Sequence, residues 1–222
     1  MVQKSKGQQT KEEVITSAVK LFNMNGYSGT SIRAIAKEAG VNIALVSYYF
    51  GGKSGLLEHL MSTFLEGYIQ TLEEAFQETD LEKEKISGRL MKIADRLIAY
   101  QQDCFYLSRF VHREMTLDTV LVRELMATYL MKEKYLLEKI FLEAAKRRQI
   151  RKIPVDLLVM QYRDMIIMPF LQPQYIRKVF FLQPNDGYFR RSYLKFIEHW
   201  VGQILKSHDH YRVNVLPHAR AY

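Results

Sequence analysis

Apolar residues recur at helical spacing along nearly the whole chain, and the pattern divides it into consecutive amphipathic helices. Thr10, with Glu13 three positions later, has the spacing of a capping box, so the first helix is expected to begin at Thr10. Its end is expected at Asn25-Gly26. The apolar stripe of this helix consists of Val14, Ile15, Ala18, Leu21 and Phe22.

A shorter pattern of the same kind occupies residues 30–53, with the sequence TSIRAIAKEAGVNIALVSYYFGGK. Thr30 or Ser31 is expected to cap a first short helix, because a hydroxyl accepts hydrogen bonds from the unpaired N–H groups at a helix start. Gly40 follows the last apolar position, where the left-handed conformation that ends a helix is easiest for glycine. Asn42 then caps a second helix. Helix, glycine turn and helix together predict a helix-turn-helix, whose second helix lies in the DNA major groove.

The pattern beyond this segment is helical almost throughout, with no convincing run of alternating residues. A long helix is expected from Lys53 to about Glu78, followed by a polar, charge-rich joint. The helices expected after the joint are 86–102, 105–115, 119–149 with Asp118 as its cap, 155–168 between Pro154 and Pro169, 173–182 and 187–206. The predicted fold is therefore all-α.

Four consecutive parts follow from these elements. We expect an N-terminal three-helix helix-turn-helix DNA-binding domain in residues 1–52, and a connecting helix and joint in residues 53–85. A C-terminal helical domain occupies residues 86–207. Residues 208–222 are a tail.

The composition narrows the class of partner and the compartment. The formal net charge of +8 over 222 residues favours an anionic partner, without separating DNA from RNA or a membrane surface. Cys104 is the single cysteine, so no disulfide forms within the chain, as in a reducing cytoplasm. The first residues lack the apolar run of a signal peptide, and no segment is long and apolar enough to span a bilayer. We expect a cytoplasmic, nucleoid-associated protein without membrane insertion.

The start and the exposed face of the second short helix are the candidates for reading bases. Ala44 is small enough to let the helix approach the bases, and Tyr48 is better explained by a base or phosphate contact than by burial. Tyr49 fits either burial or a phosphate contact. Arg33 follows two hydroxyl residues at a helix start, which favours DNA over a solvated position. Lys53 stands in a first helical turn, where a cation is unfavourable unless a phosphate lies opposite.

The first nine residues form a polar arm that carries Lys4 and Lys6. This arm is either a frayed terminus or a segment that touches phosphates or the minor groove.

These motifs resemble the DNA-binding domain of the TetR family of bacterial regulators. The resemblance rests on Thr30-Ser31-Ile32-Arg33, Ala39-Gly40-Val41, Tyr48-Tyr49-Phe50 and the run from Lys53 to Leu57. It implies DNA contacts by Thr30, Ser31, Arg33, Asn42, Ala44, Ser47, Tyr48, Tyr49 and Lys53. Two features depart from the family pattern. Ile43 and Ser47 stand where a basic or polar residue and a tyrosine are frequent, and Gly51-Gly52 replaces the usual Pro-Ser pair.

The resemblance also implies a homodimer and an effector site, which make the helical domain of residues 86–207 a dimerisation and ligand-type domain. The final long helices, around residues 155–168 and 188–206, are expected to pair with those of a second copy in a four-helix bundle. Two-fold symmetry then predicts an inverted-repeat DNA site. The candidates for lining an effector pocket are Tyr100, Phe105, Phe110, Met126, Tyr129, Met160 and Met165, although such residues are more often ordinary core.

One predicted helix carries a dense polar group. Its members are Arg109, His112, Arg113 and Glu114. A solvated face is the favoured interpretation, and a ligand anchor, a dimer salt-bridge cluster or a protein-binding surface are the alternatives.

Residues 109–135 and 168–176 resemble those of a TetR-type protein from spore-forming bacteria, which acts in division-ring placement and chromosome capture. This resemblance implies a dimeric, sequence-specific DNA-binding protein linked to cell division and chromosome position, with a cell-division protein as a further candidate partner. The alternative is a ligand-responsive repressor of a neighbouring operon. An enzyme is disfavoured, because Gly-rich phosphate loops, nucleophile elbows and zinc spacings are lacking in the sequence. Neither a cofactor nor a metal is expected.

Overall fold

The computed structural model describes residues 5–78, 85–150 and 153–205. Every regular element in these ranges is a helix, so the all-α prediction is confirmed. The N-terminal elements are α1 (Lys6–Asn25), α2 (Ile32–Glu38), α3 (Ile43–Phe50) and α4 (Lys53–Gln77). The C-terminal elements are α5 (Ile86–Asp103), α6 (Phe105–Glu114), α7 (Val120–Leu125), the π-helical turn η1 (Met126–Leu130), α8 (Met131–Lys146), α9 (Val155–Leu171), α10 (Pro173–Val179) and α11 (Gly187–Ile204).

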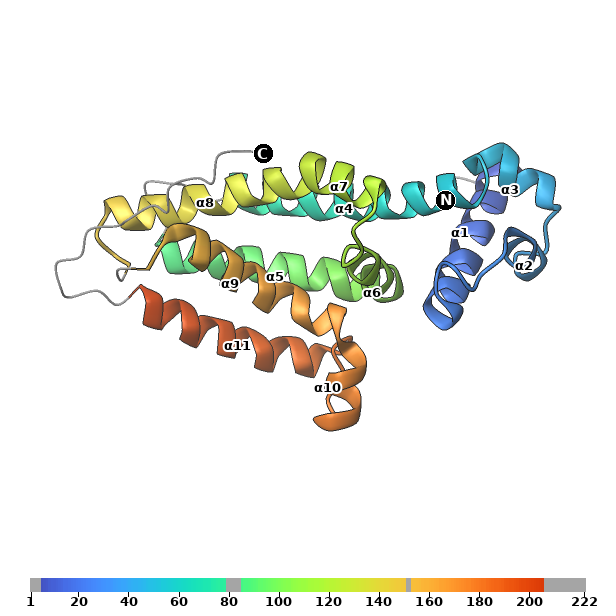
Figure 1. Cartoon of the computed structure of the whole chain (residues 1–222). Coiled ribbons are helices and arrows are strands. Elements are labelled where there is room, and N and C mark those ends of the chain that lie inside the picture. The colour runs from blue at the N-terminus through green and yellow to red at the C-terminus, as the bar shows by residue number, and fades with distance from the viewer. Residues whose placement is uncertain (1–4, 79–84, 151–152, 206–222) are drawn as a thin grey trace.

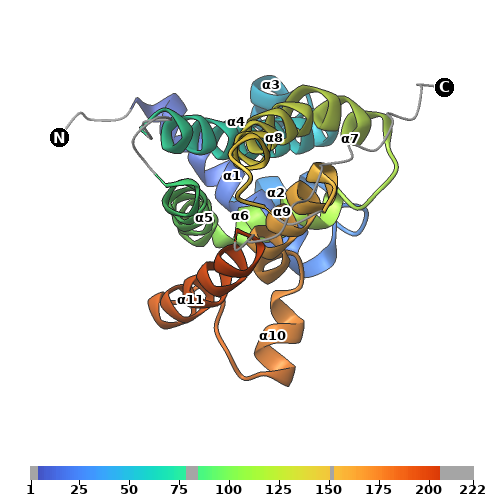
Figure 2. The same ribbon diagram turned by 90° about the vertical axis from the view of Figure 1, so that its left-hand side faces the viewer.

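The long helix α4 connects the two groups of elements (Figure 1). Helices α1, α2 and α3 gather around one end of α4, while its other end lies beside α5 and α8. Helix α5 also packs on α11, and α9 packs on α6 and α8. The end-on view shows α10 projecting from the body beside α11 (Figure 2). None of the helices in the described ranges is long and apolar enough to cross a membrane.

Helix α1 begins one turn earlier than the sequence pattern predicts. The hydroxyl of Ser5 accepts a hydrogen bond from the Gln8 backbone N–H, and the Gln8 side chain accepts one from the Ser5 N–H, both at 3.3 Å. Ser5 and Gln8 therefore form the capping box, and Thr10 lies inside the helix, where its hydroxyl donates to the Lys6 carbonyl. The expected start at Thr10 is wrong. Lys6 of the proposed arm is helical, and Lys4 lies outside the described residues.

The segment expected as one helix from residue 119 contains the π turn η1 between α7 and α8. Thr119, and not Asp118, accepts the hydrogen bond from the Val122 N–H that caps α7. Asp118 instead forms an ion pair with Arg123.

Helix α9 continues through Pro169 to Leu171, although a proline was expected to end it. A proline inside a helix leaves the carbonyl four residues earlier without its usual N–H partner. That carbonyl belongs to Met165, and the Tyr193 hydroxyl of α11 donates to it at 2.8 Å. The bond from a second helix satisfies the group that the proline leaves unpaired.

Two polar networks lie inside the C-terminal helices. Glu133 is 1% exposed and accepts from the Tyr68 hydroxyl at 2.9 Å and from the Arg163 Nε at 2.7 Å. His112 is buried and lies 2.6 Å from the Gln101 side-chain oxygen. Burial, followed by the nearby charge of Arg163, lowers the pKa of His112 to about 3, so its ring is neutral at pH 7.

The Glu133 network leads to a prediction on stability. The Glu133→Gln variant keeps the side-chain size but removes the buried counter-charge of Arg163, which then retains the exposed Asp164 at 3.7 Å. We expect the free energy of unfolding to fall by about 3 kcal/mol, near the lower end for breaking a buried ion pair. Glu143→Gln is the matched control, since Glu143 pairs with Arg147 on the surface of the same helix and contributes at most about 0.5 kcal/mol. Urea unfolding followed by circular dichroism measures both variants, and equal losses would contradict the prediction.

Candidate nucleic-acid interface

The helix-turn-helix is held by hydrogen bonds between near neighbours in the sequence. The Ser31 hydroxyl accepts from the Ala34 N–H at 3.1 Å, and the Asn42 side-chain oxygen accepts from the Ala44 N–H at 2.8 Å. Gly40 has a φ of 67° in the turn between them. The predicted caps are therefore confirmed, with Ser31 as the N-cap of α2.

The joint after α3 requires glycine. Gly51 and Gly52 have φ angles of 71° and 97°, in the region that side chains with a Cβ rarely adopt. The Gly51-Gly52 pair that departs from the family pattern thus turns the chain from α3 into α4 through two residues with positive φ.

Helix α3 is anchored on one side and open on the other. Val46 is its single fully buried residue, at 0% exposure, and it belongs to the core that includes Ile35 of α2. Tyr48 is 80% exposed. Leu45 is also exposed, because this short helix is covered on one side alone. The remaining exposed residues at the start and on the open face of α3 are Asn42, Ile43, Ala44 and Ser47.

The two tyrosines of α3 differ in their surroundings. Tyr49 is half-buried, and the Lys11 ammonium of α1 lies 5.2 Å from the centroid of its ring. The Tyr48 ring meets the edge of the Tyr49 ring at a centroid distance of 5.2 Å and otherwise faces solvent. Tyr49 therefore fixes α3 against α1, whereas the Tyr48 side chain is available for binding.

Two basic side chains flank α3. Arg33 is exposed in the first turn of α2. Lys53 is half-buried in the first turn of α4, with its ammonium 4.2 Å from the centroid of the Tyr27 ring. The aromatic face offsets part of the unfavourable effect of the helix dipole on this cation. A phosphate opposite Lys53 is therefore not needed to explain its position.

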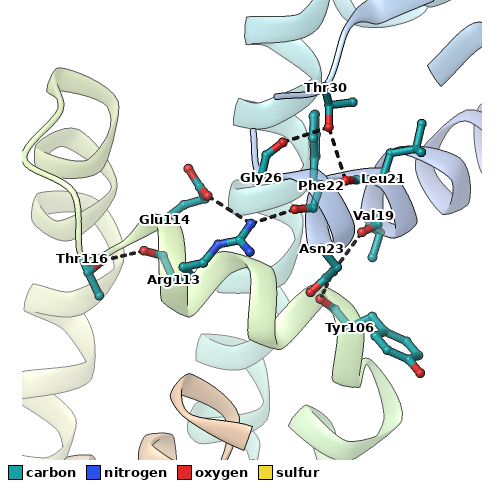
Figure 3. Close-up of polar contacts among 10 residues, drawn as sticks. All are labelled: Val19, Leu21, Phe22, Asn23, Gly26, Thr30, Tyr106, Arg113, Glu114 and Thr116. Atoms are coloured by element: carbon teal, nitrogen blue, oxygen red, sulfur yellow. Dashed lines mark hydrogen bonds and ion pairs between the residues drawn. The ribbon is translucent and has the colours of Figure 1, made fainter. Parts of the chain in front are cut away.

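Thr30 does not fit the expected role in DNA contact. It is 1% exposed, and its hydroxyl donates to the carbonyls of Gly26 at 2.8 Å and Leu21 at 3.3 Å (Figure 3). The side chain ties the end of α1 to the segment before α2. Its hydroxyl is engaged inside the protein and does not reach a surface.

The helix-turn-helix unit meets the C-terminal helices where α1 packs on α6 (Figure 3). The rings of Phe22 and Phe110 stack at 5.1 Å between centroids. The Arg113 guanidinium donates to the Phe22 carbonyl at 2.8 Å, and the Asn23 amide donates to the Tyr106 carbonyl at 2.8 Å. The sequence pattern did not indicate these contacts, because their partners are far apart in the chain.

The polar group on α6 is not a solvated face. His112 and Glu114 are buried, and Glu114 accepts a hydrogen bond from Arg113 at 3.4 Å. Helix α1 covers one side of α6, while α4 and α9 cover others. The prediction of a solvated face was wrong, because it assumed that other helices cover α6 on one side alone. Arg109 is half-buried and lies at a separate cleft.

The seven residues proposed for an effector pocket do not converge. Tyr100 donates to the Phe64 carbonyl at 2.8 Å, and Tyr129 donates to Glu66 at 2.9 Å. Phe105 packs against Phe170, Phe110 against Phe22, and Met126 is exposed. Met160 and Met165 line an open groove on α9. One cavity deep in the C-terminal helices, beside Phe64, His112 and Glu133, has about 10 Å³ of free space, which is room for one water molecule.

The described residues contain no group of three His, Cys, Asp or Glu side chains suited to a metal ion.

Comparisons with known proteins agree with this geometry. Residues 14–60 match the family model for bacterial regulatory proteins of the tetR family. The chain is 44% identical over 200 residues to the probable HTH-type transcriptional regulator YttP of Bacillus subtilis (strain 168), covering 90% of this chain and 96% of that protein. It is 29% identical over 110 residues to the HTH-type transcriptional regulator BetI of Brucella anthropi, covering 49% of this chain and 57% of that protein.

Among solved structures, the fold resembles the TetR-family regulator PfmR of Thermus thermophilus with a TM-score of 0.69 and 18% identity. That likeness covers 87% of this chain and 99% of PfmR. The ketosteroid transcriptional regulator KstR2 of Mycobacterium tuberculosis gives a TM-score of 0.72 at 13% identity, over 92% of this chain and 98% of KstR2. These likenesses concern the fold alone.

The burial of Thr30 leads to a prediction. The Thr30→Val variant keeps the shape but removes the hydroxyl, so the free energy of unfolding should fall by about 1–2 kcal/mol. The DNA affinity of the folded variant should equal that of the parent chain, as measured by fluorescence anisotropy well below the unfolding temperature. Unchanged stability together with lost DNA binding would return Thr30 to the set of contact residues.

Proposed function

The chain belongs to the TetR family of bacterial regulatory proteins, and from this we propose that it acts as a homodimeric transcription regulator that binds inverted-repeat DNA through α3. The observation that carries this proposal is the open face of α3. Val46 anchors the helix, while Tyr48 and its neighbours on the other side face solvent. An exposed helix of this kind, presented at the end of an all-α body, fits the major groove.

Within this proposal the contacts fall into two classes. Residues of α3 that face solvent read base edges, and residues at the end of α3 and at the starts of α2 and α4 position the backbone phosphates. We assign base contacts to Asn42, Ala44, Ser47 and Tyr48, and phosphate contacts to Ser31, Arg33, Tyr49 and Lys53. Thr30 is left out because of its burial. Exposed Ile43 adds an apolar surface suited to a thymine methyl group.

The proposed dimer forms through α9 and α11. Met160 of α9 is 59% exposed and Phe196 of α11 is 54% exposed, and together with their neighbours they line an apolar groove of about 640 Å³. Such a contiguous apolar surface is unusual on a monomer and marks an interaction site. A two-fold axis across it gives two copies of α3 for two half-sites.

The favoured form of this function is a ligand-responsive repressor. The relatives named above are described as transcriptional regulators, which favours a repressor over a role in cell division. Contacts between α1 and α6 supply a route by which a ligand bound among the C-terminal helices alters the placement of α3.

The second candidate is a role in cell-division placement and chromosome position, with a cell-division protein as partner. It rests on the resemblance of residues 109–135 and 168–176 to RefZ, a TetR-type protein of spore-forming bacteria. Genome-wide mapping of bound DNA separates the two candidates. A site beside a neighbouring promoter supports the repressor, whereas a few dispersed palindromic sites placed by chromosome position support the division role.

The DNA contacts are tested by single substitutions. Arg33→Ala should weaken binding by a similar factor on every DNA sequence, because it removes one phosphate contact. Measured at several salt concentrations, the slope of log Kd against log salt concentration should fall by about 1. Tyr48→Ala should weaken binding without lowering stability, because the ring is largely exposed. Tyr135→Ala is the matched control, since Tyr135 is exposed on α8. Fluorescence anisotropy with a mapped site gives the Kd, and unchanged binding by both test variants would show that the recognition surface is misplaced.

The dimer is tested by placing a charge in the apolar groove. Met160→Lys brings two ammonium groups into the buried interface of a symmetric dimer, so sedimentation equilibrium should shift toward the 26.2 kDa monomer. Met131→Lys, on the exposed face of α8, should leave the mass unchanged. A Met160→Lys protein that remains fully dimeric would place the dimer surface elsewhere.

A further inference from the structure

A second concave site lies between α6 and the junction of α9 with α10. It is a cleft of about 270 Å³, separate from the groove on α9. Helix α6 contributes two arginines to its wall, and the junction contributes polar and aromatic groups. The lining includes Arg109, Arg113, Gln172, Pro173, Gln174 and Tyr175.

Positive charge in this region is only partly balanced by ion pairs. Within residues 5–78, 85–150 and 153–205, no acidic side chain lies within 4.0 Å of the Arg109 guanidinium. Arg113 has one acidic neighbour, Glu114, at 3.4 Å, and directs the same nitrogen to the Phe22 carbonyl.

Arg177 of α10 adds a third guanidinium, whose charge acts on Arg109. It lies 5.1 Å from the centroid of the Phe105 ring and donates to the neutral side chain of Asn185 at 3.1 Å. Its Nε is buried and has no hydrogen-bond partner among the described residues. Burial, and then the charges of Arg113 and Arg177, lower the pKa of Arg109.

Three guanidinium groups that share one carboxylate repel one another, and an unpaired buried N–H group adds to the free-energy cost of the arrangement. Groups perturbed in this way and placed at a cleft are frequent at binding sites. A negatively charged ligand in the cleft would offset the repulsion between Arg109 and its cationic neighbours.

We propose that this cleft binds an oxyanion, namely the phosphate or carboxylate group of a small molecule. The planar, forked guanidinium matches two oxygens of such a group, and no carboxylate in the described part of the chain competes for that of Arg109. Gln172 and Tyr175 supply neutral hydrogen-bonding groups at the rim. The volume suits a fragment of the size of pyrophosphate or a short dicarboxylate.

The position of the cleft gives the ligand a route to α1. Arg113 both lines the cleft and donates to the Phe22 carbonyl of α1, so an anion that attracts Arg113 competes with that hydrogen bond. This regulatory consequence rests on the proposed function in DNA binding, whereas anion binding by itself does not.

Isothermal titration of the full chain at low ionic strength tests the site, with sodium pyrophosphate and sodium succinate as separate probes and KCl at matched ionic strength as reference. We expect saturable binding of at least one probe with a Kd below about 10 mM. The Arg109→Gln variant should raise that Kd at least tenfold. The tighter probe identifies phosphate or carboxylate as the preferred group. Lys139→Gln, which removes one exposed charge on α8, should bind as the parent chain does.

Thermal unfolding of the same variants separates loss of the binding site from loss of folding. Because Arg109 makes no ion pair with a described residue and is repelled by its neighbours, Arg109→Gln should fold with an unchanged or higher midpoint of thermal unfolding. If that variant does not fold, Arg109→Lys replaces it as the test. Lysine keeps the positive charge but lacks the forked guanidinium, so its Kd for the probe should be several-fold higher than that of the parent chain. The proposal is overturned if neither probe binds. It is also overturned if Arg109→Gln and Lys139→Gln weaken binding equally. Finally, it is overturned if Arg109→Gln leaves binding unchanged, as it would if the probe bound to the DNA-binding face.

DNA affinity with and without the tighter probe then tests the regulatory consequence. A change of several-fold that is absent in Arg109→Gln supports it, and no change in the presence of bound probe overturns it. Failure of the chain to bind DNA without any probe would overturn the proposed function instead, and would leave the anion site standing.

Discussion

The packing of α1 on α6 is the contact on which the arrangement of the two halves depends. Stacked rings of Phe22 and Phe110 supply the apolar part, and two side chains donate to backbone carbonyls across the junction, Arg113 to Phe22 and Asn23 to Tyr106. Because these bonds end on main-chain atoms of helices, they fix helix positions and not merely side-chain rotamers. The placement of the helix-turn-helix therefore follows from the placement of α6.

This junction also explains why α6 carries so many polar residues. A helix covered on several sides buries polar groups as well as apolar ones, and each buried polar group needs a partner. His112 has Gln101, and Glu114 has Arg113. Arg109 lacks an acidic partner among the described residues, unlike Arg113. Its side chain lines the cleft, where a bound anion could take the place of that partner.

At the other end of the connection, α3 is held by its caps, by buried Val46 and by half-buried Phe50, which packs against the core. The small anchor leaves most of the helix surface free, which suits a helix that must enter a groove. Tyr49 limits its rotation by packing toward α1, and the glycine pair after α3 sets the angle at which α4 departs.

The sequence by itself determined the features that depend on near neighbours: the all-α class from helical periodicity, and the caps of α2 and α3, whose groups lie within a few positions of the N–H groups they serve. The tertiary structure alone decided the features whose partners are distant in the chain. Arg113 and Asn23 bond to carbonyls 91 and 83 residues away, and Tyr193 satisfies the carbonyl that Pro169 leaves unpaired. Thr30 turned inward for a related reason, since its two acceptors come together only where α1 ends and the chain folds back. Local hydrogen bonds fix which residues form helices, whereas burial by distant helices fixes which side chains of those helices remain free to bind.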